Sequence, residues 1–138
     1  MKTALNITLI EDNPADARLI QEMLSESSYG VFRIEPVGSL KEGFDRIQRE
    51  RPDVVLLDLA LPDSNGLETL TDMQRSFPDL PVVVLTSSTG SDDVRRAYEL
   101  GANSYLKKPA TFESLQELVR TLDLYWIMLN VRPEHDSG

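Results

Sequence analysis

The chain alternates short apolar runs with segments whose apolar residues recur at helical spacing, and this pattern repeats five times. Runs rich in Val, Ile and Leu are typical of strands covered on both faces, as in a parallel sheet. The predicted strands are residues 5–10, 31–35, 54–57, 81–85 and 104–106. Because parallel strands need crossover connections, which are usually helices, the alternation restricts the chain to an α/β fold with right-handed crossovers.

Five strands predict a doubly wound, flavodoxin-like (βα)5 parallel sheet with the strand order 2-1-3-4-5. The second strand is more polar than the others, which favours a place at an edge of the sheet. The length of 138 residues suits one domain. We assign residues 1–129 to this domain and expect residues 130–138, which lack periodicity, to form a mobile tail.

Residues that start and stop helices flank the predicted helical segments. Asp12 or Asn13 can cap the first helix, because Pro14 then falls in its first turn. Ser39 and Glu42 form a capping box at the start of the second helix. The remaining predicted boundaries are N-caps at Ser91 and Thr111 and a glycine stop at Gly101. The side chains predicted to point inward are Ala17, Ile20, Leu24, Leu40, Phe44, Ile47, Leu70, Met73, Phe77, Val94, Ala97, Tyr98, Leu115, Leu118, Val119, Leu122, Trp126 and Leu129.

Composition excludes several classes of protein. There is no cysteine, so disulfides, thiolate metal sites and thiol nucleophiles are absent. The formal net charge of −9 argues against nonspecific binding of nucleic acid, which requires a basic surface. No apolar run approaches the roughly 20 residues of a membrane span, and residues 1–13 fit a first strand better than a signal peptide. We therefore expect a cytoplasmic protein that binds neither nucleic acid nor membrane.

Three acidic residues follow two of the predicted strands. Glu11 and Asp12 come directly after the first strand, and Asp58 comes directly after the third. In the predicted order these strands are neighbours, and ligands bind at the carboxyl ends of such strands. Carboxylates that converge there repel one another unless a hard cation lies between them, and Mg²⁺ prefers carboxylate, water and phosphate oxygens. Alternatively, Asp58 caps a loop, while Glu11 and Asp12 are acids that favour a helix dipole.

Three further residues lie at or near the ends of the fourth and fifth strands. The hydroxyl of Thr86 can bond a phosphoryl oxygen, and Lys108 provides a compact positive charge suited to phosphate. The plainer alternatives are a turn residue for Thr86 and a solvated surface lysine for Lys108. Tyr105, inside the fifth strand, has either a core-packing role or a mobile, switching role.

Four segments carry a resemblance to a known family. They are LIEDN, VVLLDLALPDSNGLE, VVVLTSS and GANSYLKKPA, which occur in this order at the ends of the first, third, fourth and fifth strands. Together they resemble the receiver domain of two-component response regulators over nearly the whole chain. The resemblance implies that Asp58 accepts a phosphoryl group from a phosphohistidine on a sensor histidine kinase or a histidine phosphotransfer protein.

The same resemblance implies a metal site around Asp58. Asp12 and Asp58 would bind Mg²⁺ directly, and Mn²⁺ can substitute for it. The backbone carbonyl of Ala60 would complete the protein ligands, whereas Glu11 would act mainly through metal-bound water.

Phosphoryl binding and switching are implied as well. Thr86 and Lys108 would hold the phosphoryl oxygens. Thr86 and Tyr105 would form a switch pair, in which Thr86 moves toward the phosphoryl group and Tyr105 turns inward. The Lys108–Pro109 bond is expected to be cis, which is a deliberate feature where an X–Pro bond adopts it. Phosphorylation would thus be a local charge event that biases a two-state element.

The end of the chain resembles that of single-domain regulators related to those paired with bacterial phytochromes. Members of that group often dimerise through the fourth helix, fifth strand and fifth helix, so a homodimer is expected there. Tyr125, Trp126 and Met128 would supply an apolar patch for it. Alternatively, Trp126 packs inward, since it lies four residues after Leu122.

Three functions are compatible with these residues. The first is a phosphorylation switch, or a phosphate shuttle in a multistep relay, with at most slow autodephosphorylation and therefore no enzymatic activity of its own. The second is a Mg²⁺-dependent phosphohydrolase of the haloacid dehalogenase kind. Those enzymes carry a D-x-D pattern, whereas Leu59 and Ala60 follow Asp58, so a general acid is missing. The third is an unphosphorylated scaffold, which the complete set of Asp12, Asp58, Thr86 and Lys108 argues against.

Overall fold

Five parallel strands form one sheet, in the order β2-β1-β3-β4-β5 that the sequence predicts. The computed structural model describes residues 4–25, 31–59, 61, 66–86, 91–108 and 111–131. The strands are β1 (Ala4–Ile10), β2 (Val31–Val37), β3 (Val54–Asp58), β4 (Val82–Thr86) and β5 (Ser104–Lys107). They alternate with the helices α1 (Pro14–Ser25), α2 (Leu40–Arg49), α3 (Gly66–Ser76), α4 (Ser91–Glu99) and α5 (Phe112–Val131). In this part of the chain, no helix combines the length and apolar character needed to cross a bilayer.

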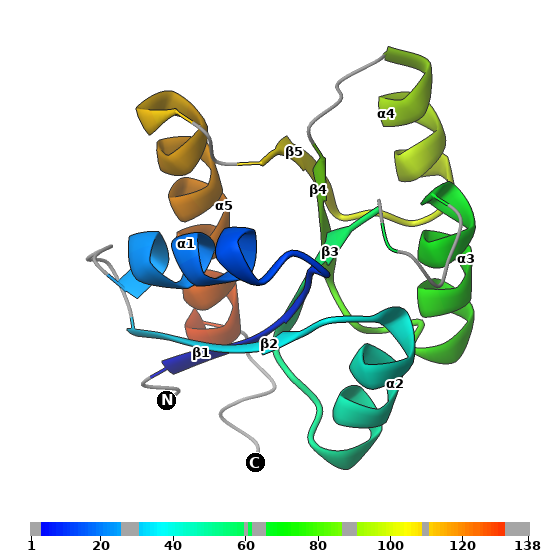
Figure 1. Cartoon of the computed structure of the whole chain (residues 1–138), viewed down its shortest axis with the longest axis horizontal. Coiled ribbons are helices and arrows are strands. Elements are labelled where there is room, and N and C mark those ends of the chain that lie inside the picture. Colours follow the sequence, from blue (N-terminus) through cyan, green and yellow to red (C-terminus); the bar gives the residue numbers. More distant parts are fainter. Residues whose placement is uncertain are drawn as a thin grey trace.

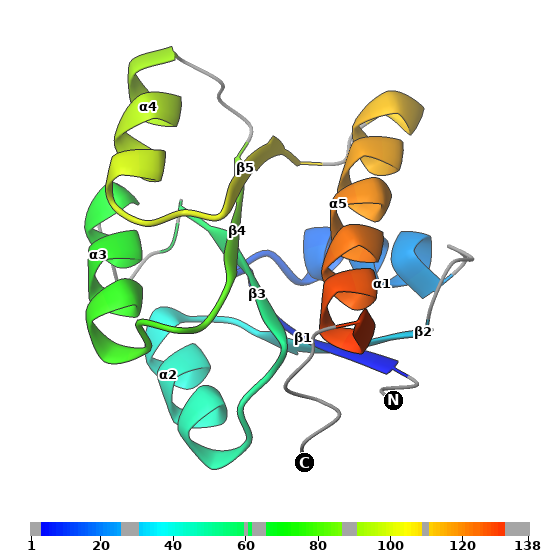
Figure 2. The same ribbon diagram turned by 180° about the vertical axis from the view of Figure 1, so that it is seen from behind.

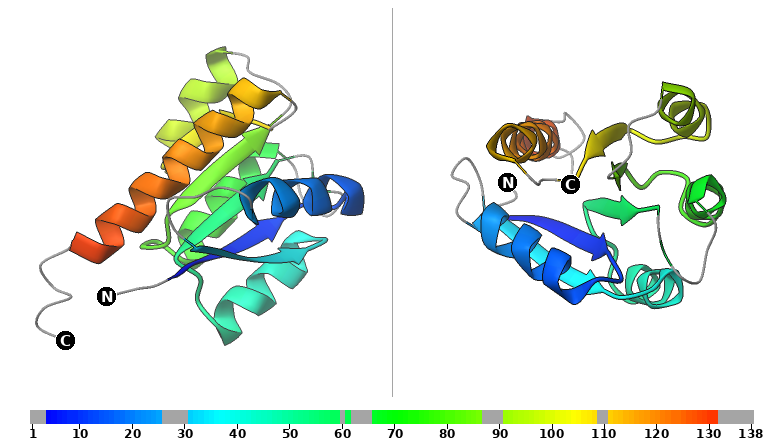
Figure 3. Two further views of the ribbon diagram at one scale, coloured as in Figure 1. Left: turned by 90° about the vertical axis from the view of Figure 1, so that its left-hand side faces the viewer. Right: turned by 45° about the horizontal axis from the view of Figure 1, so that its top comes forward.

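The helices cover both faces of the sheet. In Figure 1 and Figure 3, α1 and α5 lie on one face, while α2, α3 and α4 lie on the other. Figure 2, seen from behind, shows the same separation. Both faces are therefore shielded from water, which explains why the strands are apolar on both sides.

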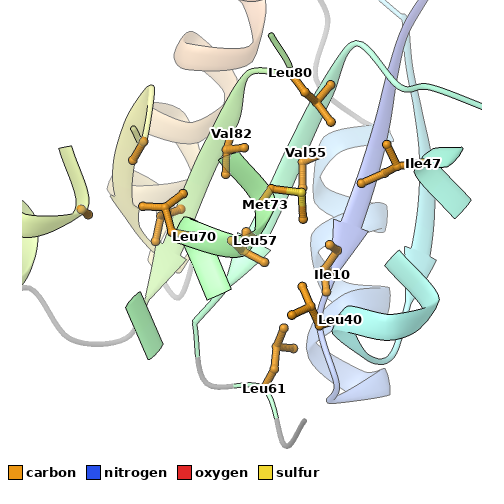
Figure 4. Close-up of a cluster of buried hydrophobic side chains, with 13 residues drawn as sticks. Ile10, Leu40, Ile47, Val55, Leu57, Leu61, Leu70, Met73, Leu80 and Val82 are labelled. Atoms are coloured by element: carbon orange, nitrogen blue, oxygen red, sulfur yellow. The ribbon is translucent and has the colours of Figure 1, made fainter. Parts of the chain in front are cut away.

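Each strand contributes to two hydrophobic cores, because successive side chains point to opposite faces of a sheet. In β3, Val55 and Leu57 pack beneath α2, α3 and α4, whereas Val54 and Leu56 pack beneath α1 and α5. Figure 4 shows the first of these cores, where side chains of α2 and α3 meet those of β1, β3 and β4. The phase of this alternation decides which layer receives the residue that follows each strand.

The first turn of α1 is fixed by Asn13. Its Oδ1 accepts the backbone N–H groups of Ala15 at 2.9 Å and Asp16 at 3.2 Å, so Asn13 rather than Asp12 caps the helix. This cap places the start of α1 next to the carboxyl end of β1.

The predicted caps at Ser39 and Thr111 are confirmed. Ser39 Oγ accepts the N–H of Glu42 at 3.2 Å, and Thr111 Oγ1 accepts the N–H of Ser114 at 3.2 Å. Ser114 Oγ accepts the N–H of Thr111 at 3.1 Å in return, so α5 begins with a reciprocal cap.

Two predictions need correction. Strand β2 runs past residue 35 to Val37 and includes Pro36, because an edge strand needs no N–H on its outer side. Tyr98, predicted to point inward, is 50% exposed. Its hydroxyl oxygen accepts the backbone N–H of Tyr105 at 3.2 Å, so the ring lies over the surface with its polar end bonded to β5.

Gly101 is predicted to be required at the end of α4. Its φ is +105°, and a Cβ there would lie 2.8 Å from Gln74 Cγ. Gly101→Ala should lower the free energy of unfolding by about 1–2 kcal/mol in urea denaturation, since L residues disfavour this conformation. Gly38→Ala is the control, because no atom lies within 4 Å of a Cβ at Gly38. Equal losses for both variants would contradict this explanation.

Candidate functional site

The charged residues of the site continue the alternation of three strands. In β1, β3 and β5, the last leucine to face α1 and α5 is followed two positions later by Glu11, Asp58 and Lys108, respectively. The same phase therefore carries two acids and one base to the same side of the sheet, at its carboxyl edge.

Lys108 lies between these acids. Its Nζ is 2.6 Å from Glu11 Oε1 and 3.1 Å from Asp58 Oδ2. A third carboxylate oxygen, Asp16 Oδ2, lies 3.4 Å away. The side chains of Glu11 and Asp58 are only 1% and 4% exposed, whereas that of Asp16 is 46% exposed. Lys108 thus pairs with both buried carboxylates and offsets part of the cost of burying their charge.

Burial and mutual hydrogen bonds shift the pKa values of Glu11 and Lys108. Burial raises the pKa of Glu11 to about 7, although hydrogen bonds from Lys108 and from the Asn13 N–H act to lower it. Burial alone would lower the pKa of Lys108, but its hydrogen bonds to Glu11 and Asp58 outweigh that effect, so the pKa of Lys108 is raised. The ammonium group therefore stays charged near neutral pH, and it provides the fixed positive charge of the site.

Glu11, Asp12 and Asp58 form an acidic cluster that suits a divalent cation. Each offers one carboxylate oxygen, and the three oxygens lie within 4.8 Å of one another. Glu11 and Asp58 are buried, whereas Asp12 is exposed, so the cluster opens to solvent on one side. Hard cations such as Mg²⁺ and Mn²⁺ take carboxylate oxygens and keep several waters, which this half-open donor set allows.

Asp16 was not identified from the sequence, although it contacts Lys108. In the sequence it resembles any acid in a helical first turn, where a negative charge favours the helix dipole. The contact joins α1 to the residue after β5, which lies 92 positions further along the chain. The one signal in the sequence was the position of Asp16, three residues after the Asn13 cap, because the first turn of α1 lies next to the carboxyl end of β1.

The structure describes only some of the other predicted site residues. Thr86 ends β4, where it pairs with Lys107 of β5, but its side chain lies outside the described residues. Ala60 and Pro109 also lie outside them, so the carbonyl ligand and the cis bond stay predictions. Tyr105 is partly buried and packs against the core beneath α2, α3 and α4.

Of the apolar patch predicted on α5, the structure describes the side chain of Tyr125, which is partly buried. Tyr125 packs against the core beneath α1 and α5, because it continues the inward stripe of Leu118 and Leu122 at helical spacing. Burial also raises the pKa of its hydroxyl. The side chains of Trp126 and Met128 lie outside the described residues, so their part in a patch stays a prediction.

The structure thus defines a class of protein: a flavodoxin-like domain with an acidic cluster and a lysine at the carboxyl edge of its sheet. Residues 7–120 match the sequence profile of a family described as "Response regulator receiver domain". The chain belongs to this receiver-domain family, as the sequence motifs predict.

Individual relatives agree with this assignment. The "Probable methanogenesis regulatory protein FilR2" of Methanothrix harundinacea is 42% identical over 135 residues, which cover 92% of this chain and 86% of that protein. "Response regulator Rcp1" of Synechocystis is 37% identical over 130 residues, 88% of each chain.

Solved structures show the same fold. The Mn(2+)-bound form of response regulator Rcp1 has a TM-score of 0.71 at 36% identity, over 88% of this chain and 94% of that one. The phosphorylated cyanobacterial phytochrome response regulator RcpA has a TM-score of 0.73 at 34% identity, over 90% and 94%. The predicted likeness to phytochrome-associated regulators is therefore confirmed.

We predict that Mg²⁺ stabilises the folded protein through the acidic cluster. At a free concentration ten times Kd, a cation that binds only the folded state adds about 1.4 kcal/mol to the free energy of unfolding. Thermal unfolding at increasing MgCl₂ and constant ionic strength measures this effect. Asp12→Asn should lose most of it, whereas Glu22→Gln should keep it, since Glu22 is an exposed acid of α1 that pairs with Arg18. Equal stabilisation of both variants would contradict a site at the cluster.

Proposed function

We propose that this chain is a cytoplasmic phosphoacceptor switch of a two-component pathway. Asp58 accepts a phosphoryl group from a phosphohistidine of a sensor histidine kinase or of a histidine phosphotransfer protein. The position of Asp58 carries the proposal, because its carboxylate ends β3 within the acidic cluster and lies 3.1 Å from the Lys108 ammonium group. A carboxylate between a cation site and a fixed positive charge suits nucleophilic attack on phosphorus.

The transfer needs alignment and charge neutralisation more than covalent assistance. An oxygen of Asp58 forms a bond to phosphorus as the phosphorus–nitrogen bond of phosphohistidine breaks, which leaves an acyl phosphate here and an imidazole on the donor. Lys108 provides positive charge on one side of the phosphoryl oxygens. Mg²⁺ or Mn²⁺, held by Asp12, Asp58 and the Ala60 carbonyl, would neutralise charge on the other side. Glu11 lies 2.6 Å from the ammonium group in this structure and would bind a water of the cation.

The response to phosphorylation is proposed to involve Thr86 and Tyr105. Thr86 ends β4 beside Lys107, and Tyr105 lies two residues earlier on β5. The Thr86 hydroxyl would bind a phosphoryl oxygen and draw the following loop toward Asp58, and Tyr105 would turn further inward. The changed surface of α4, β5 and α5 would then contact a partner protein or a second copy of this chain.

The relatives support this proposal over its alternatives. A phosphorylated form is described for RcpA and a Mn(2+)-bound form for Rcp1. A phosphate shuttle in a multistep relay would use the same residues. A phosphohydrolase is less well supported, because Leu59 and Ala60 follow Asp58 and supply no general acid. A scaffold would have no need for the acidic cluster and its ammonium group.

We predict that the wild-type protein, incubated with Mg²⁺ and acetyl phosphate, gains the mass of one phosphoryl group and that Asp58→Asn gains none. Intact-mass spectrometry measures the uptake, and size-exclusion chromatography of the same samples measures dimer formation. Asp53→Asn is the matched control, because Asp53 lies just before the opposite end of β3 and accepts the N–H of Asn6 at 2.8 Å. It should gain one phosphoryl group like the wild type.

The alternatives give different results in this experiment. A hydrolase would release many phosphates for each protein molecule, whereas a scaffold would take up no phosphoryl group from acetyl phosphate and would bind no beryllofluoride. Uptake by Asp58→Asn would place the acceptor elsewhere.

A further inference from the structure

We propose that Asp16 is a positioning residue, which keeps the Lys108 ammonium group beside Asp58 while a divalent cation occupies the acidic cluster. This inference rests on the proposed function and adds a residue that the receiver motifs do not include. Asp16 touches neither phosphorus nor the cation in this proposal, and it acts only through Lys108.

The contacts of Lys108 divide into two kinds. Glu11 and Asp58, at 2.6 Å and 3.1 Å, both belong to the acidic cluster. Asp16, at 3.4 Å, does not belong to it. An ammonium group has three hydrogens to donate, so it can bond all three carboxylates in the structure as it stands.

A bound cation changes this balance. It would be held by the carboxylate oxygens of Glu11 and Asp58, which also hold Lys108, and it would repel the ammonium group, since like charges a few ångströms apart interact by more than thermal energy. Both of the shortest contacts of Lys108 are therefore weakened when the cluster is filled. Among the described residues that pair with Lys108, only Asp16 lies outside the cluster, so its carboxylate would not be shared with the cation.

Asp16 is also well placed to act as a fixed point. Its N–H donates to Oδ1 of the Asn13 cap at 3.2 Å, so its backbone is tied to the first turn of α1. Lys108, by contrast, directly follows β5 and reaches the cluster through a long, flexible side chain. A carboxylate on a capped helix limits where that side chain can place its charge.

The expected effect is modest, because the Asp16 side chain is 46% exposed and its charge is partly screened by water. Exposed ion pairs of this kind correspond to about a two- to fivefold change in an equilibrium constant. Asp16→Asn should therefore weaken the binding of beryllofluoride, a phosphoryl mimic, by that factor. A purely repulsive role for Asp16 predicts the opposite, because removal of a negative charge would strengthen the binding of an anion.

The test is calorimetric titration of beryllofluoride into the Mg²⁺-loaded protein, with separate titration of Mg²⁺ alone. Asp16→Asn should bind beryllofluoride more weakly but Mg²⁺ as the wild type does, which a general loss of structure would not produce. Asp16→Glu should restore part of the affinity. Glu22→Gln removes one charge from the same helix without a contact to Lys108, and it should bind both ligands normally.

A double-mutant cycle completes the test. In a Lys108→Gln background, Asp16→Asn should have no further effect on beryllofluoride affinity. The inference is overturned if Asp16→Asn binds beryllofluoride as tightly as the wild type or more tightly, or if its effect persists without Lys108. If the wild type binds no beryllofluoride, the proposed function fails and this inference fails with it.

Discussion

The carboxyl edge of the sheet depends on one ammonium group between two buried carboxylates. Glu11 follows β1 and Asp58 ends the adjacent strand β3, and both side chains are almost fully buried. Lys108 follows β5, which β4 separates from β3, so its side chain must pass the end of β4 to reach both acids. The edge is therefore held together electrostatically only while β1, β3 and β5 keep their relative positions.

This balance makes the edge responsive to added charge. In the proposed cycle, a divalent cation competes for the carboxylates that hold Lys108, and a phosphoryl group then offers the ammonium group new oxygens on Asp58 itself. Each step changes which anion holds Lys108, and at short distances in a shielded site such changes are large. Thr86 and Tyr105, the residues proposed to adjust around Lys108, lie on β4 and β5, and β5 is the strand that leads to the lysine.

The sequence allowed the sheet order, the caps at Ser39 and Thr111 and the convergence of the acids to be predicted, because these depend on local patterns and one topological rule. Ser39 and the run before Asp58 are examples. The contact between Asp16 and Lys108 could not be predicted, since an acid in a first turn has a sufficient local explanation. The exposure of Tyr98 could not be predicted either, because a tyrosine at helical spacing suits a core or a surface with a polar partner.

The number of residues at the carboxyl ends of β1, β3 and β5 cannot change if the carboxyl edge is to survive. One residue inserted near the end of β3 would turn Asp58 toward α2, α3 and α4, and would place its charge against an apolar core. The same holds for the residues that follow β1 and β5. Two added residues would restore the orientation but carry the charged group about 6.6 Å beyond its partners. Length variation is therefore tolerated in the connections and at the amino ends of the strands, whereas the carboxyl ends have a fixed count.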